Sequence, residues 1–129
     1  MLLKIDFESE IPIYLQLKNQ IIEGIAQKEL VENDSLPSVR QLAEDIGINM
    51  HTVNKTYNML KDDGFIKLDR RKGAVIRGVA YRVTEEYKNK LQDEMKAVIA
   101  EAYCKGMKEE EFKEICSSIF KEYERRTES

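Results

Sequence analysis

The sequence predicts a mostly helical protein with one small β-hairpin, divided into two parts. Apolar residues recur at three- and four-residue spacing in five stretches, which is the period of one helix face. Between the third and the fourth stretch the pattern changes to short runs of β-branched and aromatic residues, which are typical of strands. The order predicted is therefore three helices, two strands and two further helices.

The composition suits a folded protein with one core or two small ones. The chain has 129 residues, of which 42% are hydrophobic. No apolar run approaches the roughly 18 to 20 residues that a membrane span needs, and "MLLKIDFESEIP" does not resemble a signal peptide. We therefore expect a cytoplasmic protein without a membrane partner. Cys104 and Cys116 lie in helical sequence without a CxxC motif, so we expect two reduced, partly buried thiols.

The first helix is predicted over residues 11–28. Pro12 suits the first turn, and apolar residues follow from Tyr14 to Ile25 at helical spacing. The stretch "ENDSLPS" then breaks the pattern with turn residues and a proline. One apolar face of this helix is expected to contribute to a core.

Two short helices follow, separated by a glycine. Ser38 is a plausible N-cap for a helix that Gly47 ends, since glycine readily adopts the left-handed conformation found there. Asn49 can cap a third helix that continues to about Asp63. Two helices joined by a short turn with glycine are the arrangement of a helix-turn-helix unit.

The hairpin follows Gly64. "FIKLD" and "AVIRG" read as two strands, and "RRKG" between them reads as a turn that contains Gly73. Three helices followed by a hairpin give the order of a winged helix-turn-helix domain, which we assign to residues 1–78.

Residues 79–129 are predicted to form two helices, over 84–104 and 109–125, with Gly106 between them. Such a pair folds into an antiparallel hairpin, but a hairpin alone cannot bury both apolar stripes. The stripes can pack on the first domain or on a second copy, and a four-helix arrangement of two copies favours the homodimer. The predicted dimerisation residues are Tyr87, Leu91, Met95, Val98, Ala102, Phe112, Ile115, Ile119 and Tyr123.

The third helix has a polar face opposite its apolar one. At about 100° per residue, Val53, Tyr57 and Leu60 share one side and are expected in the core. The opposite side carries the hydrogen-bonding side chains of His51, Asn54, Lys55 and Asn58. Because an asparagine amide can pair with adenine in the major groove, a helix that reads bases need not be strongly basic.

Basic charge lies next to this helix. The net charge of the chain is −3, yet residues 35–80 hold eight bases and five acids. Arg40 lies in the first turn of the second helix, where the helix dipole also favours a phosphate. The tip of the hairpin carries Arg70, Arg71 and Lys72. Such a turn alone reads as a solvated tip, but beside a helix-turn-helix it indicates contact with double-stranded DNA.

Other chemistry finds little support in the sequence. His51 has no second ligand at helical spacing, so no metal site is predicted. There is no Gly-rich phosphate loop and no nucleophile beside a base, so neither a cofactor nor an enzymatic activity is expected.

Three segments together resemble the DNA-binding domain of the GntR family of bacterial transcription regulators: "PIYLQLKNQIIEGIAQKEL", "LPSVRQLAEDIGINMHTVNKTYNMLKDDGFI" and "RRKG". The resemblance covers about residues 10–77. It implies that Arg40 contacts phosphate, that Arg71 and Gly73 belong to the wing, and that Thr52 lies in the recognition helix. The sequence departs from the family at Met50 and Asn54, where much of the family has arginine, so the family does not imply the bases that are read.

The two-helix tail resembles the YtrA-like branch, whose members are dimeric and are often encoded beside transporter genes that they control. We therefore expect a homodimeric repressor on a palindromic operator. Two alternatives stay open: a protein-interaction module on the same scaffold, and a regulator controlled by an unknown effector bound at the dimer helices. The candidate DNA-binding residues are Ser38, Arg40, Asn49, His51, Thr52, Asn54, Lys55, Asn58, Arg70, Arg71, Lys72 and Gly73.

Overall fold

The computed structural model describes residues 3–78 and 83–127 and divides into two compact units, Met1–Ala80 and Tyr81–Ser129. The first holds three helices and a two-stranded antiparallel sheet, and the second holds two helices. The predicted fold class is therefore confirmed. Residue 79, at which we expected the second region to begin, lies outside the described residues.

Helix α1, Ile13–Ala26, is shorter at both ends than the predicted 11–28. Pro12 has an extended backbone and precedes the helix as its N-cap, while Lys28 adopts a left-handed φ of 66° that a helix cannot continue through. Before α1, the chain is held along the helix by two glutamine side chains. Gln20 exchanges two hydrogen bonds with the backbone of Lys4, and Gln16 does the same with Asp6.

Helices α2, Val39–Ile46, and α3, Met50–Asp62, confirm the predicted capping. The Ser38 hydroxyl oxygen accepts a hydrogen bond from the Gln41 backbone N–H at 3.1 Å, and the Asn49 side-chain oxygen accepts one from His51 at 2.7 Å. Gly47 ends α2 with a left-handed φ of 70°. The three residues that separate α2 from α3 therefore form a tight, locally specified turn.

Strands β1, Ile66–Asp69, and β2, Gly73–Ile76, pair with Ile66 opposite Ile76 and Asp69 opposite Gly73. Gly73 is thus the first residue of β2, not part of the turn as predicted. The other edge of β2 also has partners, because the Leu36 N–H donates to the Ala74 carbonyl and the Asn33 N–H to the Ile76 carbonyl, both at 2.8 Å. The segment before α2 is thereby tied to the hairpin.

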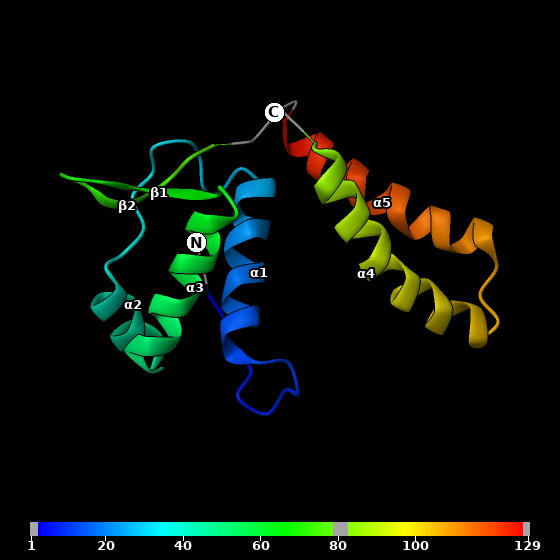
Figure 1. Cartoon of the computed structure of the whole chain (residues 1–129), viewed down its shortest axis with the longest axis horizontal. Coiled ribbons are helices and arrows are strands. Elements are labelled where there is room, and N and C mark those ends of the chain that lie inside the picture. The colour runs from blue at the N-terminus through cyan, green and yellow to red at the C-terminus, as the bar shows by residue number, and fades with distance from the viewer. Residues whose placement is uncertain (1–2, 79–82, 128–129) are drawn as a thin grey trace. The chain divides into compact units, whose positions relative to one another are not determined.

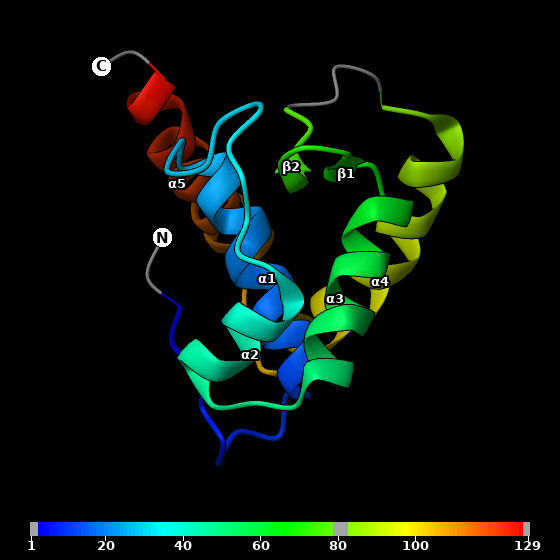
Figure 2. The same ribbon diagram turned by 90° about the vertical axis from the view of Figure 1, so that its left-hand side faces the viewer.

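The core of the first unit lies between α1, α3 and the hairpin. Figures 1 and 2 show α1 and α3 side by side, with the hairpin beyond the C-terminal end of α3. The side chains predicted to form the core side of α3 are buried, and Thr56 joins them with no exposed surface. The largest fully buried side chains are Leu17, Ile21, Val53, Thr56, Leu60, Ile66, Val75 and Ile76.

The second unit is a hairpin of α4, Glu85–Cys104, and α5, Glu109–Thr127. Thr84 caps α4 by accepting a hydrogen bond from the Tyr87 N–H at 3.0 Å. None of the side chains described from residue 83 to residue 125 is buried in the single chain. Cys104 is exposed and not partly buried as predicted, whereas Cys116 is half-buried. No helix within the described ranges has the length and apolar character needed to cross a bilayer.

Candidate nucleic-acid interface

The outer face of α3 carries polar side chains, as the helical spacing predicts. His51, Asn54 and Asn58 are exposed, and Val53, Tyr57 and Leu60 on the other side are buried with 7% exposure or less. This arrangement leaves amide and imidazole groups exposed on the surface of the helix. They can donate and accept hydrogen bonds at base edges.

Lys55 lies on the same helix but its ammonium group is held to one side. Its Nζ atom lies 3.8 Å from the centre of the Tyr14 ring in the first turn of α1. Such a cation–π contact directs the charge toward α1. The sequence reasoning placed Lys55 among the base-facing residues and gave no sign of this contact.

Ser38 and Asn49, both predicted to bind DNA, use their side-chain oxygens to cap α2 and α3. The Ser38 hydroxyl proton and the Asn49 amide protons remain as donors. Both residues are exposed, so they can cap a helix and donate to a phosphate oxygen at the same time. Thr52 is half-buried in the first turn of α3.

Arg40 is exposed in the first turn of α2, where the free backbone N–H groups and the positive end of the helix dipole also favour an anion. The segment before Arg40 is held by Tyr57 of α3, whose hydroxyl donates to the Pro37 carbonyl oxygen at 2.7 Å. Burial raises the pKa of this Tyr57 hydroxyl well above its ordinary value, so it stays a donor. A core residue of α3 thereby sets the position of the α2 N-terminus.

The tip of the hairpin is shaped by Asp69, which the sequence reasoning did not single out. Its carboxylate accepts hydrogen bonds from the backbone N–H groups of Lys72 at 3.0 Å and Arg71 at 2.8 Å. These bonds lower the pKa of the carboxyl below its ordinary value. An aspartate at the start of a turn commonly accepts a hydrogen bond from the backbone N–H two residues further on, so the position of Asp69 in the sequence could have predicted this role.

The tip therefore presents its basic side chains from an ordered turn. Arg70, Arg71 and Lys72 are exposed, and Gly73 follows them with a φ of +76°. The turn and α2 project to the same side of the first unit, away from α1, and this side faces the viewer in Figure 2. The two segments that carry basic side chains, α2 and the hairpin tip, therefore lie on one side of the first unit.

In the helical hairpin, the predicted stripe divides into an inner and an outer set. Met95, Ala102, Phe112 and Tyr123 are half-buried between the helices. The exposed set has between 41% and 53% of its surface accessible and consists of Tyr87, Leu91, Val98, Ile115 and Ile119. The prediction missed three exposed apolar side chains on the other side of the hairpin, namely Ile99, Tyr103 and Phe120.

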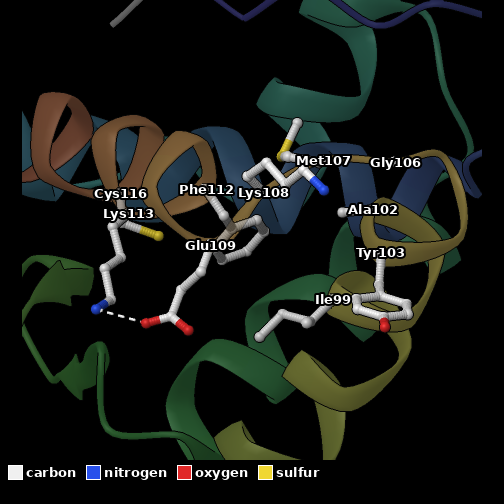
Figure 3. A pocket seen from close by; sticks show the side chains of 10 residues that line it. All are labelled: Ile99, Ala102, Tyr103, Gly106, Met107, Lys108, Glu109, Phe112, Lys113 and Cys116. Atoms are coloured by element: carbon white, nitrogen blue, oxygen red, sulfur yellow. Dashed lines mark ion pairs between the residues drawn. The ribbon is translucent and has the colours of Figure 1, made fainter.

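This other side contains a cavity of about 830 Å³ near the turn between α4 and α5. Figure 3 shows Ile99 and Tyr103 on one wall and Phe112 and Cys116 on the other. An ion pair lies at its edge, with Lys113 Nζ 2.6 Å from Glu109 Oε1. The volume and the mostly apolar lining fall within the range of small-molecule sites. Among the described residues, no group of His, Cys, Asp or Glu side chains is arranged to hold a metal ion.

The first unit has the architecture of a winged helix-turn-helix DNA-binding protein. Comparison with known proteins agrees, since the family described as "Bacterial regulatory proteins, gntR family" matches residues 13–76. The transcriptional regulator YhcF of Bacillus subtilis (strain 168) is 37% identical over 80% of this chain and 81% of its own length. The chain belongs to the gntR family and is a DNA-binding transcription regulator.

Two further relatives share more than the matched domain. The transcriptional repressor YtrA of Bacillus subtilis (strain 168) is 33% identical over 92% of each chain. The solved structure of YtrA from Sulfolobus acidocaldarius, a GntR-family transcription factor, is 43% identical with a TM-score of 0.63, and the match covers 76% of this chain and 97% of that one. The resemblance inferred from the three sequence segments is confirmed.

Proposed function

We propose that the protein is a cytoplasmic homodimeric repressor that binds a two-fold symmetric operator, with one α3 helix per half-site. The observation that carries the proposal is the exposed polar face of α3 beside the basic groups of α2 and the hairpin tip. A regulator of this kind blocks a promoter when bound. Repression, not activation, is supported by the similarity over 92% of each chain to a protein named as a repressor.

The two kinds of contact have different roles in this proposal. Arg40 and the tip residues neutralise phosphates, which supplies most of the affinity and makes it dependent on salt. Asn54, His51 and Asn58 meet base edges, which supplies the sequence preference. The separation follows from where the charges lie, since the centre of the exposed α3 face carries no arginine.

The test begins by selecting, from a pool of random duplexes, the DNA that the purified protein retains, and this selected sequence serves as the operator. Binding of the protein to the operator and to a scrambled duplex is then titrated at two salt concentrations. Arg40→Ala is expected to weaken binding to operator and scrambled duplexes alike and to reduce the salt slope by about one. Asn54→Ala is expected to weaken the operator alone, by roughly 1 to 3 kcal/mol. Equal losses for Asn54→Ala on both duplexes would contradict the division of roles. No binding to any duplex would favour the alternative of a protein-interaction module.

The proposed interface between copies is the exposed apolar set of the helical hairpin. Five large apolar side chains, each about half exposed, lie on one side of a hairpin in which no described side chain is buried. Two copies that pack these sides together form a four-helix arrangement and remove this surface from water. The exposed glutamates of α4 and α5 then lie at the rim, where water solvates them.

Sedimentation velocity tests this interface. Leu91→Glu places a charge within the apolar set and is expected to shift the protein from dimer to monomer. Asn89→Glu is the matched control, because it adds the same charge to the same helix at an exposed position outside the set. A dimer that survives Leu91→Glu unchanged would exclude this face.

A second role is favoured by the cavity near the turn of the hairpin. We propose that it accepts an apolar small molecule that alters the dimer and thereby the release of DNA. Small aromatic and aliphatic compounds should then raise the melting temperature of the wild type in a thermal-shift assay. They should not raise that of Ala102→Phe, whose larger side chain occupies part of the cavity that Ala102 lines. Equal shifts in both proteins would place the binding elsewhere.

A further inference from the structure

The contact between Tyr14 and Lys55 joins α1 to the exposed face of α3. The ammonium of Lys55 lies 3.8 Å from the ring centre. The next residue, Thr56, is buried, and its single hydroxyl proton is shared between the Tyr14 carbonyl oxygen at 3.2 Å and the Thr52 carbonyl oxygen at 3.0 Å. Two consecutive residues of α3 thus hold the ring and the main chain of one residue of α1, so the ring has a defined position relative to the recognition helix.

The position of Lys55 on the helix makes this contact relevant to DNA. At about 100° per residue, Asn54, Asn58 and His51 span about 60° of the helix surface, and Lys55 lies about 40° beyond His51. Its side chain therefore leaves the helix at the margin of the polar face, and the ring draws its charge further toward α1. In a helix seated in the major groove, the centre of the exposed face meets base edges and its margins meet the sugar-phosphate strands.

We propose that Tyr14 is a positioning residue that holds Lys55 at the α1 margin of the recognition helix, so that Lys55 contacts a phosphate oxygen and not a base. This inference rests on the proposed function of α3 as the reading helix. It removes Lys55 from the set of base-reading candidates and leaves His51, Asn54 and Asn58. It also extends the interface to α1, which the sequence reasoning had assigned only to the core.

The strength of the contact suits this role. A cation–π contact at an exposed site is worth roughly a two- to fivefold change in an equilibrium constant. That is enough to restrict a flexible lysine, and because an ammonium has three N–H donors it can stay over the ring and still donate to a phosphate oxygen when DNA binds. The ring therefore guides the charge without sequestering it.

The first measurement is the binding of Lys55→Met to two duplexes of equal length, the selected operator and a scrambled version, at 50 and 200 mM salt. Methionine keeps the length of the stem and removes the charge. One lost phosphate contact lowers the salt slope by about 0.9, so the ratio of variant to wild-type Kd should fall about 3.5-fold between the two salts. The loss should be equal on both duplexes because a phosphate contact carries no sequence information.

The second measurement separates the ring of Tyr14 from its hydroxyl. Tyr14→Phe keeps the ring and should bind both duplexes as the wild type does, whereas Tyr14→Leu should weaken both by roughly two- to fivefold. Lys55→Met should cost clearly less in the Tyr14→Leu protein than in the wild type. In the free protein, the ring should shift the Lys55 ε-methylene proton resonances upfield, and this shift should persist in Tyr14→Phe and vanish in Tyr14→Leu.

Melting temperatures report the folding of each variant, and Tyr14→Met serves as the ring-free protein if Tyr14→Leu does not fold. A loss confined to the operator in Lys55→Met would make Lys55 a base contact. Equal damage from Tyr14→Phe and Tyr14→Leu, or equal costs of Lys55→Met in both backgrounds, would show that the ring does not position the lysine. Each of these outcomes overturns the inference while DNA binding stands. Failure of the wild type to bind either duplex would overturn the proposed function itself.

Discussion

Tyr57→Phe tests how the core of the first unit positions the α2 N-terminus. Tyr57 is 7% exposed, and its hydroxyl donates to the Pro37 carbonyl oxygen at 2.7 Å, three residues before Arg40. Phenylalanine keeps the packing of the ring and removes this single hydrogen bond. A hydrogen bond of this kind contributes about 1 kcal/mol net to the free energy of unfolding.

For a unit of about 80 residues, 1 kcal/mol corresponds to a fall in melting temperature of roughly 4 to 8 °C. Operator binding should weaken at most about fivefold, because the segment that carries Arg40 loses one tether but keeps its cap at Ser38. Circular dichroism during heating measures the first quantity and a mobility-shift titration the second. Tyr103→Phe makes the same chemical change at an exposed position and should leave both unchanged.

The same hydroxyl predicts a pH dependence. Its pKa is raised by burial above the ordinary 10.0, so the unfolded chain ionises this phenol at a lower pH than the folded protein does. The wild type should therefore lose stability progressively as the pH rises above about 10, and Tyr57→Phe should lose less over that range. A melting temperature of Tyr57→Phe equal to that of the wild type, with the same alkaline decline, would refute the reasoning.

Three further predictions concern local structure. Ser38→Ala removes the α2 cap and should lower the free energy of unfolding by about 1 kcal/mol in denaturant titration, whereas Ser38→Asp, which keeps a capping oxygen, should not. Gly47→Ala should destabilise by about 1 kcal/mol because of its φ of 70°, although the added carbon meets no atom within 4 Å, and Gly47→Asn should be tolerated better. Asp69→Ala should shift the amide resonances of Arg71 and Lys72. In the wild type these resonances should change only as the pH falls below the ordinary 3.8 of an aspartate, since the Asp69 pKa is lowered. Unchanged amide resonances in Asp69→Ala would contradict the assigned turn.

The sequence by itself determined the elements and their order. Helix periods, caps at Ser38 and Asn49, and the glycine after α2 act over a few residues, so they are legible without knowledge of the rest of the chain. The same holds for the division of α3 into an apolar and a polar side, because both follow from one helical period. The turn-shaping carboxylate of Asp69 is also local and could have been predicted.

Only the tertiary structure decided how these elements hold the candidate interface. The bond from Tyr57 to Pro37 joins residues 20 positions apart, and the bond from Thr56 to Tyr14 joins residues 42 positions apart. Neither hydrogen bond can be predicted from the spacing of residues along the chain, since each depends on how α1, α2 and α3 pack. The same is true of Lys55, whose position on the helix was predicted but whose charge is directed by a ring in another helix. A helical period fixes the side of the helix on which a residue lies, whereas the direction of a long, flexible side chain is set by the neighbour that packing brings to it.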